Sequence, residues 1–527
     1  MRYHQLILFF LCLSLAACQD STTPSNELGE LHFQPTGLPD AQPAFEKGLL
    51  LLHSFEYEDA REAFLEAQSI DPDFAMAYWG EAMTYNHPLW ARQLLEEGRE
   101  ALQKLDSLPA QRAEKAATPI ERDFLNAVSV LFGEGDRNER ASTYKDQMAE
   151  MRKKYPKNHE ASAFYALSLL GSVPFGRDKE VFEKSARIAE SILAENPKHP
   201  GALHYLIHSY DDPEHAQLGK NAADDYSQVA PDAAHALHMP SHIYVAMGMW
   251  DEVVQSNIAS WEASVNRKER KELDNKALNY HALHWLMYGL LQKKETKRAR
   301  QLLADMIRYC EEKPESRARS YQIAMQANYL IETGLWQDSL LMEEAKVEDL
   351  NVSQQARQLF TKGMVAYQSK NASQLDAIIE QIDDIHRKAK VRVQNTGFAM
   401  CSPAPSSPMP NQQDTDMAEV MNMELKAMRA WLQNDASEAR QWLERSCELE
   451  DAMSYSYGPP KIPKLSHELY GDWLLEMGEP GKAMEQYEAA LQRGPGRLQT
   501  LQGKLSAAQQ SGDLTVAEQV QSTLQEI

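Results

Sequence analysis

The segment HALHMPSHIY, residues 235–244, contains three histidines and places Pro240 between the second and the third. Residues three and four positions apart lie on one face of an α-helix, so His235, His238 and His242 share a stripe if the segment is helical. Pro240 lacks a backbone N–H group and must begin a helix or kink it. Because neutral imidazole is a common ligand of transition metals, the segment is a candidate metal site.

More histidines flank this segment. Nine of the sixteen histidines in the chain lie between His199 and His284. One helix directs only two or three ligands at a single ion, so a complete metal site needs side chains from neighbouring helices. The candidate metal ligands that we predict are His204, His208, His238, His242 and Asp211. The remaining pair, His281 and His284, is spaced to contribute from a further helix.

Three interpretations of this cluster remain open from the sequence. In the first, the histidines hydrogen-bond to each other or to Tyr205, Tyr244, Asp211 or Asp212 and line a groove that binds a protein or peptide. In the second, they bind zinc or copper. In the third, a metal ion or a His and Asp pair performs hydrolysis. Because no HExxH motif, nucleophile elbow or phosphate-binding loop is present, we assign no catalytic residue and expect a binding protein rather than an enzyme.

Helical hairpins are the elements that must position these histidines. Residues 41–74 and 464–497 both follow the 34-residue tetratricopeptide pattern, with small residues at the eighth, twentieth and twenty-seventh positions, an aromatic residue at the twenty-fourth and proline at the thirty-second. The matching residues are Gly48, Ala60, Phe64, Ala67 and Pro72 in the first segment and Gly471, Ala483, Tyr487, Ala490 and Pro495 in the second. Small side chains let two antiparallel helices approach closely, and the aromatic side chain fills the remaining gap.

Weaker copies of the pattern occupy the chain between these two segments. Each is a turn followed by the start of a second helix, near Gly248, Ala299, Gly334 and Ala439. No run of alternating β-branched residues predicts a strand. The predicted fold is therefore all-α, a tetratricopeptide-type α-solenoid of stacked helical hairpins. We expect repeats over residues 39–399 and 417–527, separated by a loop rich in proline and serine over residues 400–416.

Two quoted stretches carry a family resemblance. LLHSFEYEDAREAFLEAQSIDPDFAMAYWGEAMTYNHPLW, residues 51–90, and HALHMPSHIY together resemble a family of bacterial tetratricopeptide repeat lipoproteins over nearly the whole chain. The resemblance implies a right-handed superhelix whose first helices line a concave groove, where such proteins usually hold a peptide or another protein. It implies no particular reaction.

The repeat frame places the histidines in this expected superhelix. First helices that begin near Pro197, Ala234 and Tyr280 put most of the cluster at repeat positions that resemble the groove-facing ones. The predicted groove and ligand-binding residues are His208, His235, His238, His242, His281 and His284. His204 falls at a position that normally packs inward.

The N-terminus predicts a lipid anchor. Arg2, an apolar run over residues 6–15 and two alanines precede Cys18, which makes residues 1–17 a signal peptide whose ending resembles the bacterial lipobox. Cys18 is then the lipidated residue, and residues 18–38 form a flexible tether. In enterobacteria an aspartate directly after the lipidated cysteine tends to retain a lipoprotein in the inner membrane. Because Gln19 holds that place here, we expect a scaffold anchored in the cell envelope at the outer membrane.

Charge and cysteine content narrow the functional classes further. The chain has 77 acidic and 54 basic residues, a net charge of −23, which disfavours binding to nucleic acid phosphates. Besides Cys18, the mature chain keeps Cys310, Cys401 and Cys447, and these three show no spacing typical of a metal or redox motif. We therefore expect a protein or peptide partner and free thiols.

Overall fold

The computed structural model describes residues 27–173, 176–393 and 410–527. Cys18, Cys401 and most of the predicted proline-rich loop lie outside these described residues. The first half of the chain is built from α1 (Gln42–His53), α2 (Tyr57–Ile70), α3 (Ala75–Met83), α4 (Leu95–Leu105), α5 (Pro109–Glu114), α6 (Pro119–Leu131), α7 (Arg137–Lys154), α8 (His159–Ser172), α9 (Lys179–Leu193), α10 (Pro200–Tyr210), α11 (Ala216–Val229), α12 (Ala234–His238), α13 (Pro240–Met247) and α14 (Trp250–Arg270).

The second half is also helical. Its helices are α15 (Tyr280–Gln292), α16 (Thr296–Glu312), α17 (Ser316–Thr333), α18 (Val352–Gln368), α19 (Ala372–Lys390), α20 (Gln412–Leu432), α21 (Ala436–Ala452), α22 (Ser466–Glu476), α23 (Pro480–Arg493), α24 (Leu498–Ser511) and α25 (Leu514–Glu526). Short 3-10 turns are η1 (Pro39–Ala41), η2 (Pro88–Trp90), η3 (Asn275–Ala277) and η4 (Ser339–Leu341). Two short strands, β1 (Asn86–His87) and β2 (Arg92–Gln93), pair antiparallel.

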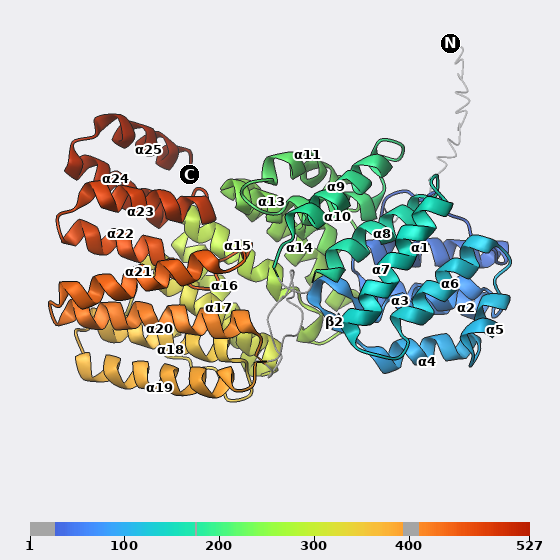
Figure 1. The fold of residues 1–527 in the computed structure, drawn as a ribbon, viewed down its shortest axis with the longest axis horizontal. Helices are drawn as coiled ribbons and strands as arrows, with labels where there is room; N and C mark the ends of the chain where they lie inside the picture. The colour runs from blue at the N-terminus through green and yellow to red at the C-terminus, as the bar shows by residue number, and fades with distance from the viewer. Residues whose placement is uncertain (1–26, 174–175, 394–409) are drawn as a thin grey trace, which may run out of the picture.

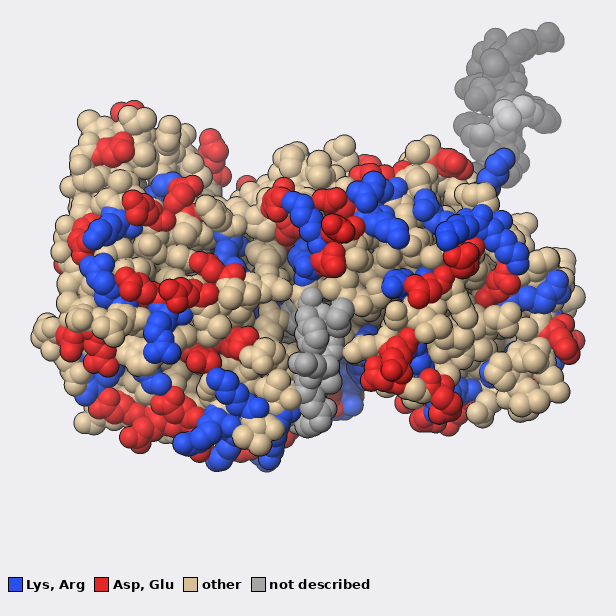
Figure 2. Space-filling view, in the orientation of Figure 1, with Lys and Arg blue, Asp and Glu red and all other residues tan. Residues whose placement is uncertain are grey.

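Successive helices stack as hairpins along the chain, each packed mainly on its neighbours in sequence (Figure 1). The prediction of an all-α solenoid is therefore confirmed. No helix among the described residues combines the length and the apolar character needed to span a bilayer. On the face shown in Figure 2, acidic and basic side chains are intermixed over both halves of the molecule.

The small residues of the two strong repeats make the expected close contacts. A Cβ atom added to Gly48 would lie 2.8 Å from the ring of Phe64, and one added to Gly471 would lie 2.8 Å from the ring of Tyr487. Ala60 in α2 is completely buried. Each hairpin therefore depends on a glycine in its first helix that leaves room for the aromatic ring of its second helix.

Three segments differ from the sequence-based expectation. Gly334 ends α17, but η4 and extended chain follow it instead of a second helix. Two side chains of α17 hold this chain, because Gln326 donates to the carbonyl of Leu340 and Arg319 donates to the carbonyl of Lys346. Helix α20 begins at Gln412, inside the predicted loop, where Asn411 and Asp414 form a capping box.

The third difference lies in the predicted tether, whose described end is packed against the fold rather than extended into solvent. Leu28 is buried, and the backbone N–H of Glu30 donates to the carbonyl of Lys198 at 3.0 Å. The hydroxyl of Thr36 donates to Glu121 at 2.9 Å. An apolar side chain and backbone hydrogen bonds thus hold part of a segment whose polar composition predicted flexibility.

The start of α24 closes the second half onto the middle of the chain. The indole N–H of Trp250 donates to the carbonyl of Gly496 at 2.9 Å, and the backbone N–H of Leu498 donates to Gln292 at 2.8 Å. Arg497 donates to the hydroxyl of Tyr288 at 2.9 Å and forms an ion pair with Glu332 at 2.6 Å. These long-range contacts brace the helices that carry the histidine cluster, unlike a solenoid whose repeats contact only their neighbours.

We predict that Ala60→Trp or Ala490→Trp lowers the free energy of unfolding by about 1–3 kcal/mol, because each alanine lies where two helices touch and the larger ring overpacks the contact. Urea unfolding followed by circular dichroism measures the change. Glu66→Trp in α2 and Glu485→Trp in α23 are matched controls at exposed positions. Equal stability of the alanine variants and these controls would contradict the repeat alignment.

Candidate metal centre

Four helices bring the histidines together. α10 carries His204 and His208, α12 and α13 carry the HALHMPSHIY segment, and α15 carries His281 and His284. The chain leaves α12 after His238 and enters α13 at Pro240, so the proline marks a helix start, as one of its two predicted roles requires. Helices α10, α12 and α15 begin at Pro200, Ala234 and Tyr280, close to the starts predicted from the repeat frame.

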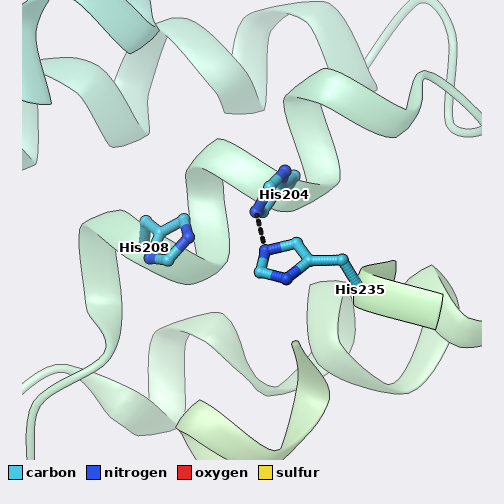
Figure 3. A group of neighbouring side chains, drawn as sticks. All are labelled: His204, His208 and His235. Atoms are coloured by element: carbon cyan, nitrogen blue, oxygen red, sulfur yellow. Dashed lines mark hydrogen bonds between the residues drawn. The ribbon is translucent and has the colours of Figure 1, made fainter. Parts of the chain in front are cut away.

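His204, His208 and His235 form one group, which we call the first triad. One ring nitrogen from each lies within 4.8 Å of the others. Figure 3 shows His204 and His208 on successive turns of α10, with His235 reaching toward them from α12. The Nε2 atoms of His204 and His235 are 3.2 Å apart. The first triad can therefore offer three imidazole nitrogens to one ion.

His238, His242 and His281 form the second triad, again with one ligand atom from each within 4.8 Å of the others. The Nε2 atoms of His238 and His242 are 3.2 Å apart. The indole of Trp285 covers this group, with its ring centroid 4.7 Å from that of His242 and 4.9 Å from that of His238. Both of these histidines are completely buried.

Asp211 links the two triads. Its Oδ2 atom lies 3.4 Å from Nδ1 of His208 and 3.2 Å from Nδ1 of His242, and its Oδ1 atom pairs with Arg177. Burial alone raises the pKa of this carboxyl, but the guanidinium of Arg177 and the hydrogen bonds from the two histidines outweigh burial and bring the pKa to about 2. Asp211 is therefore an ionised carboxylate that accepts hydrogen bonds from both rings.

Hydrogen bonds to neighbours fix which nitrogen of each second-triad ring carries its proton. The amide N–H of Asn257 donates to the carbonyl of Val253 at 2.7 Å, so its oxygen faces Nδ1 of His238 at 2.7 Å and must accept a proton from it. Nδ1 of His242 donates to the Asp211 carboxylate. With Nδ1 of both rings engaged in this way, the two Nε2 atoms face each other at 3.2 Å. In this orientation both Nε2 atoms point toward one position that a metal ion could take.

The first triad has a similar orientation on one ring. Nδ1 of His204 donates to the carbonyl of His53 at 2.7 Å, so its Nε2 presents a lone pair toward His235. Burial lowers the pKa of His204, His235 and His238 well below the ordinary value, and the neighbouring imidazoles lower it further. A proton is thus a poor cation for these positions, whereas a metal ion is suited to them.

A third group has the same residue types and a different arrangement. Glu160 accepts from Nε2 of His53 at 2.6 Å and from Nε2 of His199 at 3.2 Å. The other nitrogens of the two rings accept hydrogen bonds, from the hydroxyl of Tyr205 at 2.8 Å and from the backbone N–H of Ala202 at 3.2 Å. Each ring nitrogen has a partner of the opposite kind, so this group stabilises the fold as a satisfied buried network.

The five predicted metal ligands lie in one contiguous cluster, and their role as ligands stays a prediction. They are His204, His208, Asp211, His238 and His242. His235 joins α10 rather than His238 and His242, because it lies one turn earlier in α12, on the side toward α10. His284 lies apart and contacts Asn328 at 2.7 Å.

Four of the six predicted groove residues are buried, whereas His235 and His281 are partly exposed. The exposed fractions of His208, His238 and His242 are 1%, 0% and 0%. Side chains this deeply buried cannot contact a docked peptide, because helices and Trp285 cover them. The rings do not all point one way, since His235 meets His204 of α10 while His238 and His242 lie against Trp285 of α15.

Sequence reasoning missed the residues that orient the rings. Arg177, Asn257 and Glu160 each act alone from a distant part of the chain, and none belongs to a motif. No periodic signal identifies a single amide or carboxylate that meets a histidine only after folding.

No family model matches this chain, and no curated protein matches it. Among solved structures, yeast Tom70 is 12% identical, with 92% of this chain and 99% of that chain covered and a TM-score of 0.34. The Cut9–Hcn1 heterotetramer is 12% identical, with 91% of this chain and 78% of that chain covered and a TM-score of 0.36. The TPR domain of P58(IPK) is 13% identical, with 90% of this chain and 99% of that chain covered and a TM-score of 0.22. At these values the likeness supports no inference about activity or partner.

We predict that acid weakens the fold through His284. Burial lowers the pKa of this ring to about 4. The unfolded chain, with a pKa of about 6.5, binds a proton that the folded chain does not, so stability is complete above pH 6.5 and falls as the pH decreases toward 4. Between pH 7 and pH 5 this histidine alone accounts for about 2 kcal/mol.

Urea unfolding of the wild type and of His284→Gln at the two pH values measures this contribution. Glutamine keeps a donor for Asn328 and does not titrate, so the variant should lose about 2 kcal/mol less on acidification. The same loss in both proteins would show that His284 is not the source.

Proposed function

We propose that this protein binds transition-metal ions, zinc or copper, in the two histidine triads. The observation that carries the proposal is the pair of Nε2 atoms of His238 and His242, which lie 3.2 Å apart while Asn257 and Asp211 accept hydrogen bonds from the Nδ1 atoms. Neighbours that orient an imidazole through its other nitrogen are typical of metal-ligating histidines.

The donor set selects the kind of metal. Each triad offers three imidazole nitrogens, which suit zinc and copper, whereas calcium and magnesium prefer oxygen ligands. Asp211 adds one carboxylate between the triads and offsets part of the charge of the ions. Three protein ligands leave one position of a four-coordinate ion open to a further ligand. Each triad is complete enough for one ion, so we propose up to two ions per chain.

We predict that His238→Ala and His242→Ala each lower the metal content of the purified protein made without residues 1–18, because each removes one of the three nitrogens of the second triad. Elemental analysis after purification without added metal or a histidine tag measures the content, and circular dichroism checks that helicity is kept. His467→Ala is the matched control, since His467 contacts Gln486 and Asp451 and belongs to neither triad.

A wild-type protein without metal at neutral pH, whose melting temperature does not respond to zinc or copper, would refute the proposal. Acidification supplies a second readout. Protons compete with metal for the rings, and burial holds the pKa of His238 and His281 well below 6.5. Metal should therefore stay bound at pH 6 and be released only at lower pH.

We also propose that the protein is a lipoprotein of the cell envelope, anchored at the outer membrane through Cys18. The signal-like residues 1–17 and the cysteine that follows support this location. Cys18→Ala should move the protein from the membrane fraction to the soluble fraction, because the lipid is its hydrophobic anchor. Retention of the cleaved variant in membranes washed with salt would contradict the anchor.

Binding of a protein or peptide is the second candidate function, and a different surface supports it. A cavity of about 620 Å³ opens at the turns that join α18 to α19, α20 to α21 and α22 to α23, lined by Tyr367, Trp431, Trp473 and Met477. Aromatic side chains dominate the binding energy of many protein interfaces. Trp431→Ala should abolish cross-linking to an envelope partner, whereas the wild type and His238→Ala should retain it. Equal cross-linking by the wild type and both variants would show that this surface does not bind the partner.

A further inference from the structure

A small cavity of about 60 Å³ adjoins the second triad. It lies between α15, α17 and α18 and is closed on one side by residues 457–461. Apolar side chains such as Trp285 and Met417 form much of its wall, and no acidic residue is part of it. The polar groups of the wall, which include Ser353, Arg357 and Lys461, donate hydrogen bonds or carry positive charge.

Arg357 is the buried charge of this cavity. Its side chain is 5% exposed and donates to the carbonyl of Lys461, through Nε at 3.0 Å and Nη2 at 2.5 Å, and to Gln354 at 3.2 Å. None of the carboxylates in the described parts of the chain lies within ion-pair distance of it. Burial of a charge without a counter-ion costs folding free energy, so an anion bound beside this guanidinium would stabilise the protein.

Arg357 nevertheless stays charged at neutral pH. Burial lowers its pKa to about 10, and Asp414 offsets only part of that effect. Burial also raises the pKa of the Asp414 carboxyl, which is already engaged by Asn411 and Ser353. The nearest acidic group is therefore a weak counter-ion for this arginine.

The first turn of α18 adds to the positive potential of the cavity. Ser353, Gln354 and Arg357 all lie in the first two turns of this helix, whose N-terminus is capped by Asn351. The N-terminal end of a helix carries a partial positive charge and favours anions. Helix dipole and guanidinium thus act in the same direction.

Three residues join the cavity to the second triad. His281 belongs to both, and Trp285 and Tyr457 line the cavity while their rings contact His242, at centroid distances of 4.7 and 5.0 Å. A ligand in the cavity therefore lies beside the position where the triad would hold its ion. Three imidazoles leave one coordination position of that ion for such a ligand.

The volume of the cavity limits the size of the ligand. A space of 60 Å³ holds roughly four water molecules or one anion of about four or five heavy atoms. Phosphate, carbonate and acetate are of this size, whereas nucleotides, sugars and peptides are far larger.

We propose that this cavity binds one small oxoanion or carboxylate, held by Arg357 on one side and by the metal ion of the second triad on the other. The contact with a metal rests on the proposed function. The attraction of the anion to Arg357 does not depend on it.

Calorimetric titration of the full chain with inorganic phosphate and with acetate tests the proposal, on both metal-free and zinc-loaded protein. We expect one anion per chain and at least about tenfold weaker binding by Arg357→Gln, because a charge-assisted hydrogen bond is lost. Arg357→Lys keeps the charge and should keep most of the binding. Arg429→Gln is the matched control, since Arg429 pairs with Asp376 on the surface of α20.

Cobalt(II) in the second triad supplies a readout of the metal contact, since addition of the anion should change its visible spectrum. Equal anion binding by wild type and Arg357→Gln overturns the proposal, and so does an anion that binds without changing the cobalt spectrum. If no metal binds but Arg357→Gln still abolishes anion binding, the proposed function fails and the anion site stands. Circular dichroism of each variant, with Tyr321→Phe as a second cavity variant, separates loss of the site from loss of the fold.

Discussion

The interior of this protein depends on one constraint, which is that every buried imidazole must have a partner suited to each of its two nitrogens. Asn257 and the Asp211 carboxylate accept hydrogen bonds from Nδ1 of His238 and His242, and the Nε2 atoms of the two rings then face each other 3.2 Å apart. That orientation turns both Nε2 atoms toward the one position where our proposal places an ion. Arg177 contributes from the outside, because its charge keeps Asp211 ionised. The chemistry of the site thus follows from groups that are not themselves histidines.

The two kinds of histidine group in the molecule show why residue type alone does not define a site. His53, Glu160 and His199 are as deeply buried as the triads, yet donors and acceptors alternate along their network, so no cation is required. In each triad, two Nε2 atoms from different histidines lie 3.2 Å apart. The same reasoning applies to Arg357, whose hydrogen bonds are satisfied by a carbonyl and an amide while its charge is not. Hydrogen bonding and charge compensation are separate requirements, and a ligand site arises where only one of them is met.

The helical hairpins supply the rigidity that such a site needs. Glycine against aromatic ring, as in Gly48 with Phe64, holds the two helices of a hairpin at close range. Contacts of Trp250 and Arg497 then tie the last repeats to α14 and α15, and α15 carries His281 of the second triad. Because the positions of the rings are set by packed helices rather than loops, the rings are held in place without relying on a bound partner to order them.

The sequence by itself determined the helical class, the frame of the first and last repeats and the helix start at Pro240, because all of these follow from local spacing and from the residue types that a hairpin needs. Only the tertiary structure decided that the rings are buried, that His235 pairs with α10, and that Asn257, Asp211 and Arg177 orient the cluster. The chain beyond Gly334 and the start of α20 also departed from the local pattern. Those features depend on contacts between residues tens of positions apart, whose partners are chosen by how helices pack and not by any periodicity along the chain.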